Sequence, residues 1–259
     1  MIRGIARGIA IALIALPCAS PAQGAPATGL DLLQAMHDAY AGKWYTTLTF
    51  VQQTTARRDG RDTVSTWYES VRYTAEYGSQ LRIDVGSPSL GNGVLYTADS
   101  LWVMKGGKLD GIHAGGNALI PLIESVYLQP VARTAAELKP TGVDLGRAVI
   151  SGTWQNRAVW IAGASTLSDS TSPQIWIDVE RKVVVRTIFR PVPTRPLMDA
   201  RFDGYVPLAG GWLATKCLFY VAGALVQTED YQDWKAGMPL AASLFDVTQW
   251  TTAPHWAGH

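Results

Sequence analysis

Residues 45–73 read YTTLTFVQQTTARRDGRDTVSTWYESVRY, and this segment indicates the architecture of the chain. Its two halves, 45–55 and 63–73, are rich in the β-branched and aromatic residues that strands favour. Between them lies a polar segment, 57–62, which contains the pair Asp59-Gly60 that is typical of tight turns. The segment therefore predicts a long β-hairpin.

Further strand-like segments follow the hairpin, and their connections are short and rich in Gly, Pro, Asp and Ser. The expected strands are 81–85, 94–96, 101–104, 158–163, 174–179, 183–190, 200–205, 212–221 and 225–234. Such regular spacing favours one large antiparallel sheet over βαβ units.

Two helices are expected beside this sheet, so the fold class is α+β. In 30–41 the apolar residues recur at helical spacing, and Thr28 with Asp31 forms a capping box. The segment 117–129 has the same spacing and stops at Pro130.

Thr134 and Glu137 have the spacing of a second capping box, which predicts a short helical turn before Pro140. We find no linker, charge run or low-complexity stretch after residue 28. Residues 25–259 are therefore predicted to form a single domain.

The first 24 residues have the pattern of a secretory signal peptide. Arg3 and Arg7 precede a short apolar run, 9–16, and Ala22-Gln23-Gly24 is a plausible cleavage site. The alternative is an uncleaved membrane anchor, which the shortness of the apolar run disfavours. We expect a periplasmic protein.

The chain contains two cysteines. Pro17 stands where a lipidation signal requires a small residue, so Cys18 is not expected to carry lipid. Cleavage would leave Cys217 alone, which excludes an internal disulfide and predicts a buried strand cysteine rather than a catalytic thiol.

The composition excludes several classes of protein. Of 259 residues, 47% are hydrophobic and 17% charged, which is too apolar for a disordered chain. The formal net charge of +1 lacks the basic excess of nucleic-acid-binding proteins, so no nucleic-acid partner is expected.

Candidate chemical groups each have a simpler structural explanation. His255 and His259 have the spacing of metal ligands on a helix, but their place near the chain end favours a frayed tail. His37 lies on the apolar face of the first helix and is expected to be packed there. Asp178 and Arg186 flank a turn, which predicts an ion pair across two strands.

The carboxylates Glu229, Asp230 and Asp203 are interpreted as edge or turn residues. The sequence contains no nucleophile elbow, phosphate loop or metal-spaced cluster. We therefore expect no catalytic residue, metal or cofactor.

Several strands, such as 101–104 and 183–185, are apolar on both faces. Each face of the sheet must therefore be shielded from water by other apolar groups. The helices can cover one face, and an apolar ligand or the curled sheet itself can cover the other. The alternative is a sandwich or barrel whose core is filled by side chains. Candidates for a lipid-binding cavity are the large apolar residues Leu81, Ile83, Leu95, Trp102, Trp160, Ile175, Trp176, Ile188, Phe202 and Trp212.

The order of elements resembles the outer-membrane lipoprotein-sorting carrier family, the LolA/LolB-like fold. The motifs that carry the resemblance are individually short: Phe50-Val51-Gln52-Gln53, Leu81-Arg82-Ile83-Asp84, 92–96, 99–103, 117–122, 174–178 and Gly210-Gly211-Trp212. In the family an Arg-Pro pair precedes the second motif and its arginine latches the lid, whereas Tyr77-Gly78 stands there in this chain.

The resemblance implies a curved antiparallel half-barrel with covering helices around an apolar cavity for acyl chains. It implies a non-enzymatic periplasmic carrier that binds a lipoprotein or lipid and passes it towards the outer membrane. Membrane-bound donor and acceptor proteins would be its partners, and the carrier is expected to be a monomer. Alternatives are a periplasmic sensor of the same fold and a hydrolase with a dispersed site.

Overall fold

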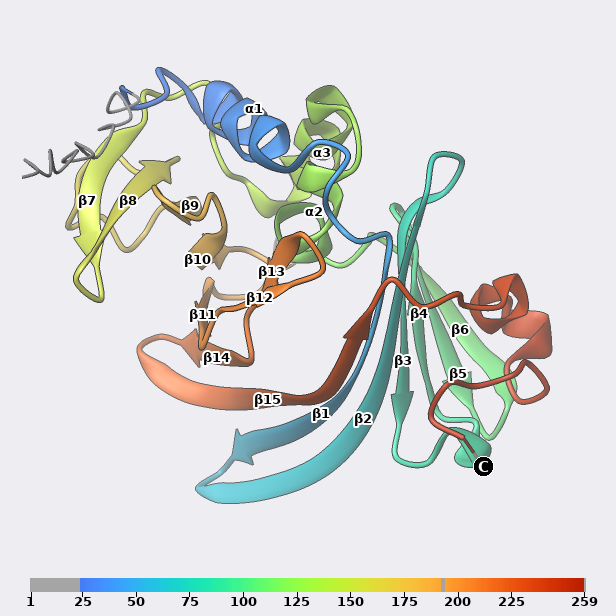
Figure 1. Ribbon diagram of the computed structural model, residues 1–259. Coiled ribbons are helices and arrows are strands. Elements are labelled where there is room, and N and C mark those ends of the chain that lie inside the picture. Colours follow the sequence, from blue (N-terminus) through green and yellow to red (C-terminus); the bar gives the residue numbers. More distant parts are fainter. Residues whose placement is uncertain (1–23, 192–193, 259) are drawn as a thin grey trace, which may run out of the picture.

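The computed structural model describes residues 24–191 and 194–258, in which one 13-stranded sheet bends around a group of helices (Figure 1). Its strands are β1 (Thr47–Arg58), β2 (Arg61–Thr74), β3 (Gly78–Val85), β4 (Gly93–Tyr96), β5 (Ser100–Lys105), β6 (Lys108–Ala114), β7 (Ile150–Trp154), β8 (Arg157–Ala162), β9 (Gln174–Asp178), β10 (Val184–Phe189), β11 (Met198–Asp203), β14 (Lys216–Val221) and β15 (Ala224–Ala236). The predicted signal peptide lies outside the described residues, apart from Gly24.

Neighbouring strands run antiparallel in the order β6-β5-β4-β3-β2-β1-β15-β14-β11-β10-β9-β8-β7. The sheet is therefore two meanders that meet where β15 pairs with β1. Strands β6 and β7 form its two edges, so the half-barrel is open. This confirms the predicted α+β half-barrel, while the pairing of β1 with β15 joins parts of the chain that the sequence pattern does not connect.

The predicted long hairpin is β1–β2, whose register runs from Thr47 opposite Arg72 to Arg58 opposite Arg61. Asp59 and Gly60 both have positive φ, 50° and 73°. That is the backbone required by the two-residue turns that match the twist of paired strands.

The strand prediction needs correction in two respects. The expected strand 212–221 is divided into β13 (Gly211–Leu213) and β14, because β13 pairs with β12 (Val206–Leu208) in a separate two-stranded sheet. The prediction also missed both edge strands, β6 and β7, and the short strand β12.

The helices that cover the sheet are α1 (Gly29–Tyr40), α2 (Ile120–Ile123) and α3 (Val131–Leu138) (Figure 1). Short 3₁₀ turns occupy Pro88–Leu90, Ser125–Tyr127, Lys139–Thr141, Ala242–Phe245 and Val247–Gln249. Helix α1 has the predicted capping box: the Asp31 amide donates to Thr28 Oγ1 and the Thr28 amide donates to an Asp31 carboxyl oxygen.

The single helix expected over 117–129 is wrong. Helix α2 is short, and the backbone leaves the helical region at Glu124 (φ −137°) before a 3₁₀ turn begins. The second capping box is wrong as well, because α3 begins directly after Pro130 and Thr134 lies inside it. The Thr134 hydroxyl and the Glu137 carboxyl both accept hydrogen bonds from Gln129 instead.

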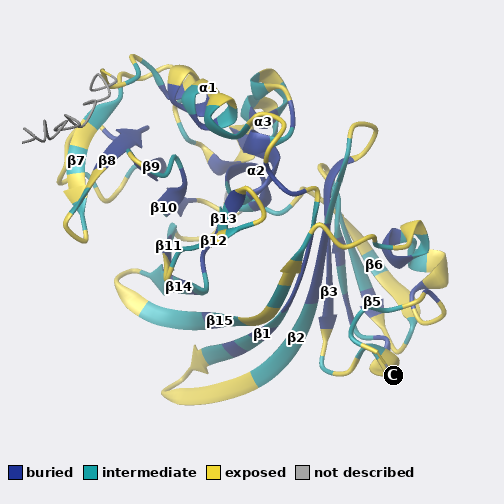
Figure 2. Cartoon of the chain, in the orientation of Figure 1, coloured by how far each residue is buried: buried dark blue, intermediate teal, exposed yellow. Residues whose placement is uncertain are grey.

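The main core lies between the helices and the face of the sheet that curves towards them, here called the concave face. The opposite, convex face is also covered. Leu95 and Met104 pack there against Leu244, Phe245 and Trp250 of the C-terminal segment. Strand β3 is consequently buried on both faces (Figure 2).

The C-terminal segment is therefore not a frayed tail as far as the structure describes it. The His255 side chain is only 3% exposed, and its Nε2 lies 3.2 Å from Asp84 Oδ2. Trp256 donates to the Ser70 hydroxyl at 2.8 Å. His259 lies outside the described residues.

The expected ion pair between Asp178 and Arg186 does not form. A register shift after Val184 places Arg186 opposite Trp176, where its Nε lies 2.8 Å from Asp199 Oδ1. Asp178 pairs with Arg157. His37 and Cys217 behave as predicted: the His37 ring bonds the Val126 carbonyl oxygen at 3.0 Å, and Cys217 is buried in β14.

Candidate functional site

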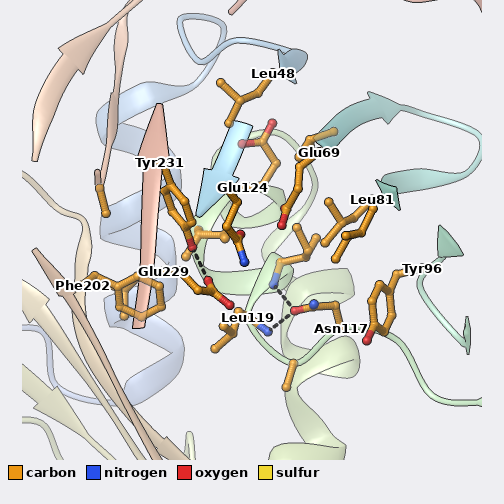
Figure 3. Close-up of a pocket in the computed structure, with 18 of the residues that line it drawn as sticks. Leu48, Glu69, Leu81, Tyr96, Asn117, Leu119, Glu124, Phe202, Glu229 and Tyr231 are labelled. Carbon is orange, nitrogen blue, oxygen red and sulfur yellow. Dashed lines mark hydrogen bonds between the residues drawn. The ribbon is translucent and has the colours of Figure 1, made fainter. Parts of the chain in front are cut away.

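A cavity of about 650 Å³ lies between the concave face and the helix side of the molecule. Strands β1, β2, β3, β14 and β15 supply one wall, and α2 with the segment before it supplies the other (Figure 3). Its size falls within the ordinary range of small-molecule sites, roughly 300–1,000 Å³.

Strand alternation determines which side chains reach this cavity. In β1 the inward residues are Leu48, Phe50 and Gln52, and in β3 they are Leu81 and Ile83. Most of the lining is aliphatic or aromatic, so the cavity can accept an apolar chain without leaving that chain in water.

The ten sequence candidates fall into three groups. Leu81, Ile83, Phe202 and Trp212 line the cavity. Trp160 and Ile175 belong to the concave core but are not part of the lining.

The other four lie away from the cavity. Leu95 and Trp102 pack beneath the C-terminal segment on the convex face, and Trp176 belongs to a second convex cluster. Ile188 follows Arg186 by two residues on β10 and therefore shares its convex side. Both faces of these strands are apolar, so the residue type alone does not show which side chains face the cavity and which face the convex side.

An aromatic cluster supports the helix side of the cavity. Trp44, just after α1, stacks on Tyr127 with ring centroids 3.8 Å apart, and it contacts Tyr40 and Tyr45 as well. The indole Nε1 of Trp44 donates to Glu124 Oε2 at 3.0 Å. The cluster holds the Glu124 carboxyl in place where the helical segment breaks.

Three glutamates line the mostly apolar cavity: Glu69, Glu124 and Glu229, hereafter the cavity glutamates (Figure 3). Glu229 on β15 accepts hydrogen bonds from Tyr231 Oη at 2.7 Å and Gln227 Nε2 at 2.6 Å. Burial raises the pKa of Glu229, and these two hydrogen bonds counter part of that rise.

The carboxyls of Glu69 and Glu124 accept fewer hydrogen bonds from the protein than the carboxyl of Glu229 does. Glu69 lies on β2 between Phe50 and Ile83 on the neighbouring strands and is 5% exposed. Burial raises its pKa well above the usual value, and the charge of Glu229 adds to the rise. Burial raises the pKa of Glu124 to about 8, although the Trp44 hydrogen bond opposes the shift.

The Tyr77-Gly78 segment lies at the turn between β2 and β3, beside helix α3. Tyr77 is 53% exposed. From the helix side, Arg133 of α3 donates to the Ala75 carbonyl oxygen at 3.3 Å and pairs with Glu137 at 3.2 Å. Gly78 leaves the room for this arginine, because a Cβ there would lie 2.5 Å from Arg133 Nη2. Helix α3 is thereby tied to the β2–β3 turn.

The prediction did not identify Glu69 or Glu124, and it placed Glu229 at an edge or turn. The signal for Glu69 was its position: it shares a strand face with Trp67 and Val71, two residues away on either side. Glu124 interrupts the apolar run 118–128. A carboxyl within such a pattern points to a buried charge rather than a solvated one.

Over the residues that the structure describes, no group of three or more His, Cys, Asp and Glu side chains could hold a metal ion. Over the same residues, no helix has the length and apolar character needed to cross a bilayer.

No protein family and no curated protein matches the sequence, but solved structures match the fold. A putative outer membrane lipoprotein-sorting protein domain from Vibrio parahaemolyticus aligns over 86% of this chain and 98% of its own, with 11% identity and a TM-score of 0.59. The chain has the fold of that lipoprotein-sorting domain.

A DUF1329 family protein from Desulfovibrio piger has the same fold, with 84% of this chain and 95% of its own aligned at 12% identity and a TM-score of 0.57. The resemblance inferred from short motifs is thus confirmed at the level of the fold. In this chain the shared fold encloses a mostly apolar cavity lined by three buried carboxyl groups.

Proposed function

We propose that this protein is a periplasmic, non-enzymatic carrier that binds the acyl chains of a lipoprotein or lipid in its cavity and passes them towards the outer membrane. The observation that carries the proposal is the cavity of about 650 Å³ between the concave sheet and its helices. The lipoprotein-sorting fold supports it further.

The energetics of such a carrier are favourable. Each methylene buried in an apolar site contributes about 0.8 kcal/mol, so an enclosed acyl chain can offset its extraction from a bilayer. The four candidates that line the cavity, Leu81, Ile83, Phe202 and Trp212, would contact the chain. Release requires that the helix side moves away from the sheet, which breaks hydrogen bonds such as those from Arg133 Nη1 to the Ala75 carbonyl oxygen and from the Ser125 hydroxyl to the Ser79 hydroxyl.

We infer further that the carrier works as a monomer between membrane-bound donor and acceptor proteins. The signal-peptide pattern in residues 1–24 supports the periplasmic location. The domain 25–259 would then be the mature carrier.

The test is to purify the mature chain from its native periplasm and to analyse organic extracts by mass spectrometry. We expect lipid or acylated peptide at a stoichiometry near one. A Phe202→Glu variant, which places a charge in the apolar lining, should lose this cargo, whereas Leu109→Glu on the exposed edge strand should retain it. Cargo-free protein that also ignores added lipid would contradict the proposal.

A further inference from the structure

The charge of the cavity lining is one-sided. In residues 24–191 and 194–258, three glutamates line the cavity, His113 lines it as well, and no Lys or Arg does. A buried carboxylate without a cation or a full set of hydrogen bonds is costly, so proteins usually pair it. Here the protein does not supply the countercharge.

Glu124 shows this most clearly. The residue is 2% exposed, and its Oε1 has no hydrogen-bond partner among the described residues, while Oε2 accepts from Trp44. Glu124 lines the cavity, but this oxygen is itself covered by neighbouring atoms, so its charge acts on whatever occupies that space, and a direct bond requires the side chain to turn (Figure 3).

Glu69 presents a carboxyl on the sheet side. The charge of another carboxyl, Glu229, adds to the rise in its pKa that burial causes. Glu229 is already held by Tyr231 and Gln227, whereas no hydrogen bond from a described residue reaches the Glu69 carboxyl. The sheet wall therefore contributes one carboxyl without a hydrogen bond, and the helix wall contributes one whose Oε1 has no partner among the described residues.

We propose that the ligand of this cavity is an apolar chain that carries a protonated amine, with Glu69 and Glu124 as its countercharge. This deepens the proposed carrier function and rests on it. An ammonium group has only hydrogen-bond donors, which match carboxylate acceptors, and charge-assisted bonds of this kind are the strong ones. The acyl part would lie along Leu48, Leu81 and Phe202.

The same lining opposes other headgroups. A fatty acid carboxylate would add a further negative charge beside three buried carboxyls that no Lys or Arg of the described residues balances. A neutral alcohol brings no positive charge, so Glu69 and Glu124 would keep the protons that their raised pKa values favour, whereas an ammonium group favours the ionised carboxylates and pairs with them. The cavity would therefore select among molecules with the same chain by the charge at the end of that chain.

The experiment compares three ligands with one chain at pH 7.5: dodecylamine and dodecanoate below their micellar concentrations, and dodecanol below its solubility limit. Binding to the delipidated wild-type protein is measured by tryptophan fluorescence. We expect dodecylamine to bind about tenfold more tightly than dodecanol, with dodecanoate weakest. Equal or tighter binding of dodecanol or dodecanoate would overturn the inference but leave the carrier function intact. If none of the three binds, the carrier function falls as well.

Isosteric variants locate the effect. Glu69→Gln and Glu124→Gln should each reduce the preference for dodecylamine several-fold and leave dodecanol binding within about twofold. Glu76→Gln, on the exposed β2–β3 turn, is the matched control and should behave as wild type. An unchanged preference in both cavity variants would contradict the assignment. The wild-type comparison remains decisive if a variant does not fold.

A further arm distinguishes the source of the amine. A diacylated lipopeptide with a free N-terminal amine is compared with its N-acylated counterpart, and dodecylamine serves as the reference. Preference for the free amine supports the inference for a lipoprotein ligand. No preference between the two peptides, with dodecylamine still favoured over dodecanol, supports it for a simple lipid amine instead.

Discussion

Buried charges on the two sides of the sheet are paired differently. On the convex side, Arg82 of β3 is 1% exposed and fully paired: it binds Asp84 through two nitrogens at 2.7 and 2.8 Å and donates to the carbonyl oxygens of Leu244 and Trp250. Its guanidinium also lies 3.8 Å from the centroid of the Trp250 ring. On the concave side, no Lys or Arg of residues 24–191 and 194–258 lines the cavity beside the carboxyls of Glu69 and Glu124.

The difference shows how buried charges in one sheet can serve two purposes. The Arg82 cluster, which consists of Arg82, Asp84 and the carbonyl oxygens of Leu244 and Trp250, has its charges and hydrogen bonds satisfied within the protein. It therefore fixes the C-terminal segment to the sheet. The cavity glutamates are incomplete, which lowers stability when the cavity is empty and leaves interaction energy available for a ligand. Each prediction below changes one side of this comparison.

The largest effect is expected from Arg82→Met. The substitution leaves Asp84, which is 0% exposed, with only His255 near it and frees the C-terminal segment. Breaking a buried pair by removing one partner costs about 3–5 kcal/mol, so urea unfolding should show a loss of that size.

The control for Arg82 is Arg57→Met, which breaks an ion pair between side chains 52% and 43% exposed. An exposed pair contributes about 0–1 kcal/mol, so this variant should unfold close to wild type. Similar losses in the two variants would contradict the structural role given to the Arg82 cluster.

A smaller, pH-dependent effect is expected from Glu124→Gln in the ligand-free protein. The pKa of Glu124 is about 8 in the folded state against 4.5 ordinarily, so the folded protein holds a proton that the unfolded chain releases between these values. The contribution of the Glu124 proton to the free energy of unfolding is therefore fully present below about pH 4.5, and it is lost as the pH rises through 8.

Glutamine does not titrate, so the variant should gain stability relative to wild type as the pH rises from 5 to 8, by a few kcal/mol. Urea unfolding at both pH values measures the gain, with Glu76→Gln as the exposed control. A difference between variant and wild type that stays constant with pH would argue against the buried position of this carboxyl.

The smallest effect on stability is expected from Arg133→Ala, about 1 kcal/mol or less, since the side chain is 33% exposed. The change removes the contact between α3 and the β2–β3 turn, so a bound fluorescent lipid should leave the cavity several-fold faster in stopped-flow measurements. Arg147→Ala, which affects an exposed pair with Asp144, should leave the release rate unchanged.

Local pattern predicted the strands well because hairpins and turns depend on neighbours in sequence. The β1–β2 hairpin and the capping box of α1 are of this kind. The pairing of β1 with β15 was not predictable, because Thr54 and Glu229 meet across more than half of the chain and no local signal links them.

The site was predicted only in part for a related reason. Leu81 and Leu95 are similar residues on neighbouring strands, yet Leu81 lines the cavity and Leu95 packs under the C-terminal segment. That segment has no helix or strand periodicity, and its contacts with Arg82 span 168 residues, so it was interpreted as a tail. If this segment is not known to cover the convex face, the sequence does not show which face of the sheet lines the cavity.

The joint between β1 and β15 has a consequence for the order in which the molecule folds. The hairpin β1–β2 can form early from local contacts, but β1 keeps an unpaired edge until β15, the last strand, has been synthesised. Pairing between strands so far apart in sequence slows folding, because closing the long intervening loop costs entropy before the contacts between the strands can form. Glu229 and Tyr231 both lie on β15, so the cavity is completed only at the final step, and a partly folded chain lacks that wall of the cavity.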